Sequence, residues 1–84
     1  MKTEALMVSL KAIVKPYVKS EEGFNNMTAD TDFLKDLKIN SANLIDVILD
    51  IENAFDIVID NESMEKMLTV RSAIEIITTK LSEK

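Results

Sequence analysis

Only one glycine and one proline interrupt the 84 residues of this sequence, of which 46% are hydrophobic. The low content of turn-forming residues, together with the high apolar content, indicates a packed helical protein and not a disordered tail. A chain of this length builds one core, so a single all-α domain over residues 1–84 is expected. Apolar residues recur at helical spacing in three stretches, which are Leu6, Leu10, Ile13, Val14 and Tyr17, then Leu44, Val47, Ile48, Ile51 and Phe55, then Val70, Ala73, Ile74, Ile77 and Leu81.

Proline and clusters of polar residues set the expected element boundaries. Pro16 is expected to end or kink the first helix, since proline lacks an amide donor and clashes with the preceding turn. Residues 20–39 mix turn-favouring with apolar side chains, which predicts a long loop held against the core. The expected elements are, in chain order, a helix from about Thr3, the loop 20–39, a helix 42–55, a connector 57–59, a short helical turn 63–67 and a last helix capped by Thr69. This order describes a four-helix bundle with three longer helices, one short helix and a long first loop.

The residue types that are missing exclude most enzyme chemistry. The chain has no His, Cys or Trp, so the usual general base, the thiolate nucleophile, soft-metal ligation and disulfides are absent. A binding or carrying module is therefore expected, not an enzyme. The acidic residues do not have the spacing of a calcium loop, so no metal site is predicted.

Charge and hydropathy also limit the partners and the location. The formal net charge of −5 argues against nucleic acid and against an anionic membrane surface as partners. The N-terminal segment lacks the apolar stretch of a signal peptide, and no run approaches the roughly 20 apolar residues of a membrane span. A monomeric cytoplasmic protein without membrane insertion is therefore expected.

Ser41 lies at the expected start of the second helix. A serine at this position is an ordinary N-cap, whose hydroxyl accepts a hydrogen bond from an amide two or three residues on. The position also suits a phosphodiester, because unpaired amides and the helix dipole favour negative charge there. The two roles are compatible, and the long loop before Ser41 is expected to leave its hydroxyl accessible to a modifying enzyme.

The segment around Ser41 resembles the acyl carrier protein family. In that pattern Asp-Leu and two residues precede Asp-Ser-Leu, an acidic helix follows, and a stretch like Phe-Asp-Ile-Glu-Ile closes it. The corresponding residues here are Asp36-Leu37, Asn40-Ser41-Ala42, Asp46 and Phe55-Asp56-Ile57-Val58-Ile59, and Thr69-Val70 opens a last helix that also fits. The resemblance covers nearly the whole chain. It implies that Ser41 carries a covalent 4'-phosphopantetheine arm, taken from coenzyme A, whose thiol holds acyl groups as thioesters.

The same resemblance implies the partners and identifies two departures. The partners would be a phosphopantetheinyl transferase (holo-carrier synthase) and acyl-processing synthases and transferases with basic docking patches. Asn40 stands where the family has Asp, which removes a charge that helps the modifying enzyme and its metal to engage. Ala42 stands where the family has Leu, which shrinks an apolar contact used by partner enzymes. These departures predict a specialised carrier serving a dedicated pathway.

A docking surface is expected on the second helix. Ile45 and Leu49 lie between its apolar and polar faces, so they either form a small apolar docking patch or widen the buried face. Between Ile39 and Met64 the chain has acidic residues and no Lys or Arg, a charge run that would steer basic partners toward Ser41. The expected docking residues are Asn40, Ala42, Ile45, Asp46, Leu49, Asp50, Glu52 and Asp56.

Two alternatives to an acyl carrier in fatty acid, related lipid or polyketide biosynthesis are left open by the sequence. A peptidyl, aminoacyl or D-alanyl carrier would share the fold and the arm but load an amino acid. A small helical interaction module would bind a partner through its acidic face and use Ser41 only as a helix cap.

Overall fold

The computed structural model describes residues 3–83, and within them the chain forms five α-helices and one 3₁₀ helix. The expectation of an all-α fold is confirmed. The elements are α1 (Thr3–Val14), η1 (Lys15–Tyr17), α2 (Glu21–Asn25), α3 (Ser41–Phe55), α4 (Asn61–Lys66) and α5 (Val70–Ser82). Pro16 ends the first helix as predicted, since the chain continues there as η1 with proline in its first turn.

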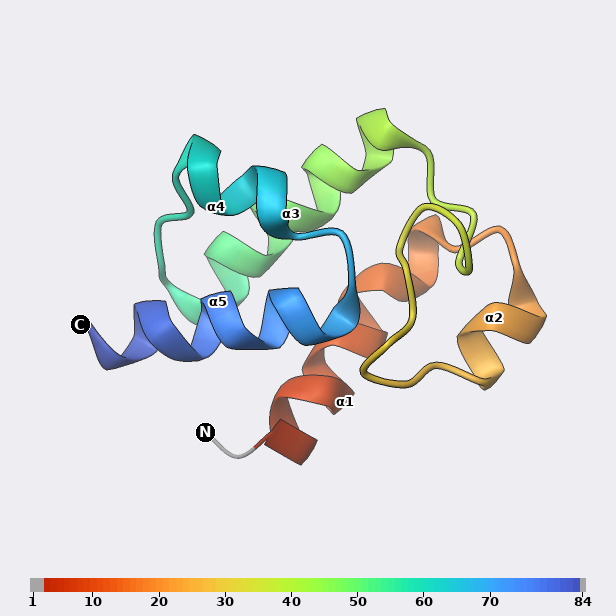
Figure 1. Ribbon diagram of the computed structural model, residues 1–84, viewed down its shortest axis with the longest axis horizontal. Coiled ribbons are helices and arrows are strands. Elements are labelled where there is room, and N and C mark those ends of the chain that lie inside the picture. The colour runs from red at the N-terminus through yellow and green to blue at the C-terminus, as the bar shows by residue number, and fades with distance from the viewer. Residues whose placement is uncertain (1–2, 84) are drawn as a thin grey trace.

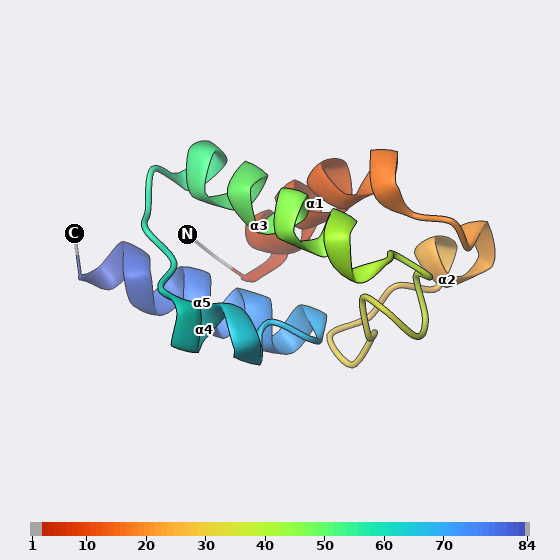
Figure 2. The same ribbon diagram turned by 90° about the horizontal axis from the view of Figure 1, so that it is seen from above.

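The helices pack in two layers around a shared apolar core (Figures 1 and 2). Seen from above in Figure 2, α1 and α3 lie on one side and α4 and α5 on the other, while α2 lies at one end of the molecule. Each long helix turns its apolar stripe inward, and Leu10, Ile51 and Ile77 are fully buried at the centre. Burial of these stripes is the main favourable contribution to folding.

The chain between α2 and α3 is held against the start of α5, as the prediction of a pinned loop requires. Phe33 N donates to Leu68 O at 3.0 Å, and Val70 N donates to Thr31 O at 3.0 Å, which gives one isolated antiparallel bridge. Phe33 and Leu37 are buried and attach the loop to the core. In Figure 1 this yellow segment passes between α2 and the start of α5.

Two element boundaries differ from the prediction. Glu21–Asn25 is a short helix and not part of a loop, because Ser20 caps it by accepting a hydrogen bond from Gly23 N at 3.1 Å. The short fourth helix begins at Asn61, two residues early, since Asp60 Oδ1 accepts from Ser63 N at 2.8 Å. The predicted cap of the last helix is confirmed, as Thr69 accepts from the amide at the third helical position.

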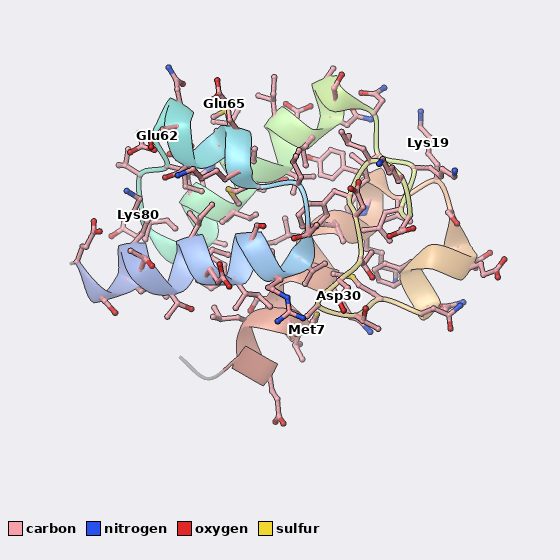
Figure 3. The ribbon with its side chains drawn as sticks, in the orientation of Figure 1. Met7, Lys19, Asp30, Glu62, Glu65 and Lys80 are labelled. Atoms are coloured by element: carbon pink, nitrogen blue, oxygen red, sulfur yellow. The ribbon has the colours of Figure 1, made fainter. Side chains whose placement is uncertain are left out.

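Two ion pairs join α5 to neighbouring segments of the chain. Lys80 Nζ lies 3.7 Å from Asp60 Oδ2 in the connector between α3 and α4. Figure 3 shows Lys80 reaching from α5 toward this connector. At the other end of α5, Arg71 pairs with Asp30 of the loop at 2.8 Å. The Arg71–Asp30 pair is exposed, whereas the Lys80 side chain is only 21% exposed. Exposed pairs of this kind contribute little stability individually.

Candidate functional site

Asn40, and not Ser41, caps α3. The Asn40 backbone is extended, with φ −76° and ψ 159°, and its Oδ1 accepts from Asn43 N at 2.9 Å. Ser41 is the first helical residue, so its expected role as the cap is wrong. Serine and asparagine are nearly equal in cap preference, so the residue type does not decide between them. The buried Ile39 fixes the chain one residue before Asn40 and sets where the helix begins.

The side chain of Ser41 is consequently free for other chemistry. The residue is exposed, and its hydroxyl has no hydrogen-bond partner among residues 3–83. The chain just before it is firmly placed, because Leu37 and Ile39 are buried and Ile39 N donates to Phe33 O at 3.1 Å. Lys38 between them has φ 58°, an uncommon conformation for a residue with a Cβ. A free hydroxyl on an anchored segment is accessible to an enzyme without unfolding of the helix.

The N-terminus of α3 differs from that of α5 in its free amides. The first two amides of α5, on Val70 and Arg71, donate to carbonyl groups of the loop at 3.0 and 2.7 Å. The amides of Ser41 and Ala42 have no acceptor in the part of the chain that the structure describes. Unpaired amides at the positive end of a helix dipole favour a phosphate. The start of α3 therefore fits a phosphodiester on the Ser41 hydroxyl.

The exposed face of α3 carries two apolar side chains beside acidic ones. Ile45 is 51% exposed and Leu49 is 48% exposed, so both lie outside the buried stripe of the helix. That stripe consists of Leu44, Val47, Ile48 and Ile51. Asp46 is exposed one turn after the start of the helix. Exposed apolar side chains next to polar ones are also found in protein interfaces, which have an apolar core and a polar rim.

The remaining acidic residues predicted for docking have partners within the chain. Glu52 is half-buried, and its Oε2 accepts from Ile59 N at 2.8 Å, which fixes the connector after α3. Asp56 caps the C-terminus of α3 in the left-handed region, with φ 54°. Asp50 Oδ2 accepts from the Tyr17 hydroxyl at 2.8 Å. Glu52 and Asp56 thus help to end α3, while Asp46 and Asp50 lie along its exposed side.

Tyr17 contacts α3 at Asp50, a contact that the sequence did not predict. Its helical spacing predicted a core residue, and its ring does pack against the core, but its hydroxyl reaches α3. The hydrogen bond to Asp50, followed by desolvation and the charges of Asp50 and Asp46, raises the pKa of Tyr17 above its ordinary value. No local pattern links residues 33 positions apart, so the sequence held no signal for this contact.

Within residues 3–83, no three His, Cys, Asp or Glu side chains are grouped so that they could hold a metal ion. No helix in that range is long and apolar enough to cross a membrane. What the arrangement offers is a free hydroxyl at a phosphate-favouring helix start, next to a partly apolar acidic face.

Comparison with known proteins shows the class to which this fold and site belong. The family described as "Phosphopantetheine attachment site" matches residues 12–77. The chain is 31% identical to the acyl carrier protein of Coprothermobacter proteolyticus over the whole of both chains. It is 29% identical to the acyl carrier protein of Petrotoga mobilis, over 98% of this chain and 94% of that one.

The chain belongs to the acyl carrier protein family. It is a carrier protein and not an enzyme, and its prosthetic group is a covalently attached 4'-phosphopantetheine. When bound, that group supplies a thiol, which the polypeptide itself lacks because it has no cysteine. A phosphopantetheinyl transferase and acyl-processing enzymes are the partners expected of a member of this family.

Proposed function

We propose that Ser41 is the attachment residue and that the protein carries acyl intermediates of fatty acid or related lipid or polyketide biosynthesis. The observation that supports Ser41 most directly is its exposed hydroxyl, free of partners among residues 3–83, at the first position of α3. The adjacent amides of Ser41 and Ala42 are positioned to favour the negative charge of a phosphodiester. Asn40 holds the helix start in place without a charge of its own.

An intact-mass measurement tests this assignment. Incubation of the apo protein with coenzyme A and a broad-specificity phosphopantetheinyl transferase should add the mass of one arm. Ser41→Ala should take no arm, while Ser82→Ala, at an exposed serine near the end of α5, should be modified like the wild type. Modification of Ser41→Ala, or an unmodified wild type, would show that the arm is attached elsewhere or not at all.

The cargo is tested by loading the modified protein. Acyl transferases should form a thioester with the arm, whereas amino-acid-activating enzymes of peptidyl or D-alanyl carriers should not load it. The reverse result would assign the chain to the aminoacyl carriers. A chain that takes no arm at all, yet binds partners through its acidic face, would be an interaction module.

We propose that α3 is the docking surface, with Ile45 and Leu49 as apolar contacts and acidic residues at the margin. Its charges should steer basic partners, an effect screened over roughly 10 Å at 0.1 M salt. Reversal of Asp46 and Asp50 to Lys should slow modification of Ser41 at low salt without changing the helical circular dichroism. The control reverses Glu65 and Glu75, exposed acids of α4 and α5, with the same change of net charge. Equal slowing in both double variants would exclude α3 as the specific surface.

We further propose that Asn40 and Ala42 adapt the carrier to a dedicated pathway. Asn40 caps α3 without charge, and Ala42 is exposed beside Ser41, so neither offers what the family residues Asp and Leu offer a partner. Ala42→Leu adds methylenes worth up to about 0.8 kcal/mol each when buried at an interface. Combined with Asn40→Asp, it should increase activity with the enzymes of general fatty acid synthesis. If the natural sequence already equals a general carrier in that assay, the two departures have no role in specialisation.

A further inference from the structure

We propose that Tyr17 of η1 positions the Asp50 carboxylate of α3 for contact with the basic surface of a phosphopantetheinyl transferase. The inference rests on the proposed function, because it deepens the role of the docking face. Its basis is the hydrogen bond from the Tyr17 hydroxyl to Asp50 Oδ2, 2.8 Å long and exposed to solvent. The bond joins two segments 33 residues apart, and Asp50 is an exposed acid of α3 four residues after Asp46.

The backbone and ring of Tyr17 are held in place by neighbouring residues. Its ring is half-buried and packs against the core, and it ends a 3₁₀ helix that contains Pro16, which restricts the backbone. Val18 N, directly after it, donates to Val14 O at 3.1 Å and closes this turn onto α1. This packing limits the positions of the ring, and it places the hydroxyl within hydrogen-bond distance of Asp50 on α3.

The tyrosine hydroxyl bonds to Oδ2 of Asp50, while Oδ1 has no hydrogen-bond partner among residues 3–83. An exposed aspartate otherwise exchanges between rotamers, and a partner has to immobilise it at a cost in entropy. A hydrogen bond to an ionised carboxylate is among the stronger kinds, so it biases Asp50 toward one orientation before a partner arrives. Asp46, one turn earlier on α3, has no such donor among residues 3–83. The hydrogen bond to Asp50, desolvation, and the charges of Asp50 and Asp46 raise the pKa of Tyr17, which agrees with a hydroxyl close to both acids.

Tyr17→Phe tests the inference, because it removes the hydroxyl and keeps the ring. The probe is a phosphopantetheinyl transferase, titrated with apo protein in the absence of coenzyme A to obtain Kd and supplied with coenzyme A to obtain kcat. Tyr17→Phe should raise Kd about two- to tenfold, the range expected when one more side chain must be immobilised on binding. The value of kcat should not change, since the reacting hydroxyl of Ser41 is untouched.

Measuring Tyr17→Phe in two variant backgrounds distinguishes a positioning role of Tyr17 from a purely structural one. In Asp50→Ala the effect of Tyr17→Phe on Kd should vanish, while in the matched Asp46→Ala background it should persist. A tyrosine that only stabilises the fold would lower the melting temperature and shift Kd equally in both backgrounds. That result, or an unchanged Kd in Tyr17→Phe, overturns the inference. Absence of binding by the wild type overturns the docking face together with this inference, whereas binding without modification overturns only the assignment of Ser41.

Discussion

Asn40→Ala should lower the stability of the protein and leave its modification intact. Ser41→Ala should leave the stability nearly unchanged and abolish modification. Asn40→Ala removes the acceptor of the 2.9 Å hydrogen bond from Asn43 N. The amides of Ser41 and Ala42 already lack an acceptor within residues 3–83, so a third amide at this helix start would lose its partner. Loss of an Asn cap costs about 1 kcal/mol, with a range of roughly 0.5–2 kcal/mol. Since Asn40 is exposed, water replaces part of the bond and keeps the cost near the middle of that range.

Ser41→Ala removes a hydroxyl that has no partner among residues 3–83, at an exposed first helical position. Its effect on the free energy of unfolding should stay within about 0.5 kcal/mol, as for surface substitutions in general. Urea unfolding of the apo variants, followed by far-ultraviolet circular dichroism, measures both values. For a chain of this size, about 1 kcal/mol corresponds to a fall of roughly 4–8 °C in Tm. Asn53→Ala, at an exposed position inside α3, is the matched control and should not be destabilised.

In the modification assay the more stable variant should be the inactive one. Ser41→Ala should accept no arm although it is folded and stable, while Asn40→Ala should still be modified although it is less stable. A larger loss of stability in Ser41→Ala than in Asn40→Ala would refute the reasoning. It would mean that the Ser41 hydroxyl caps the helix, which is the role that the structure assigns to Asn40.

Three further predictions concern the packing of the chain and its titration. Gly23→Ala should destabilise the fold by about 1–3 kcal/mol in urea unfolding, because a Cβ there would overlap the carbonyl oxygen of Asp36 and push α2 away. Ile51→Ala, at a fully buried position of α3, should cost about 2–5 kcal/mol in the same assay, and a smaller loss would contradict its central place in the core. The absorbance titration of Tyr17 should have its midpoint above the ordinary pKa of about 10, and Asp50→Ala should lower it. Because the folded-state pKa is raised, the stability contributed by this bond is present below pH about 10 and lost as pH rises through the raised pKa.

Helix α2 shows why part of the fold was not predictable. Its five residues include Gly23 and Asn25, which favour turns, and no apolar period extends over so short a segment. Its stability comes from the Ser20 cap and from close contact between Gly23 and the backbone of Asp36, thirteen residues further along the chain. Only the folded chain brings that backbone against the helix.

The cap of α3 shows a different limit. Asn40 and Ser41 are adjacent and nearly equivalent as caps, so residue preference could not decide between them. The course of the loop decided it, because buried Ile39 fixes the chain one residue before Asn40 and sets where the helix begins. The prediction that Ser41 is available for attachment does not depend on the cap, and the free hydroxyl supports it.

The sequence by itself determined the long helices, the resemblance to acyl carriers and the place of Ser41 at the start of α3, because each depends on residue order within one segment. Helical period, caps and motif spacing are local properties that a linear reading recovers. The tertiary structure alone decided that Ile45 and Leu49 are exposed, since exposure depends on which helices cover α3. It also brought Tyr17 to Asp50, a contact between elements that meet only after α1 packs against α3.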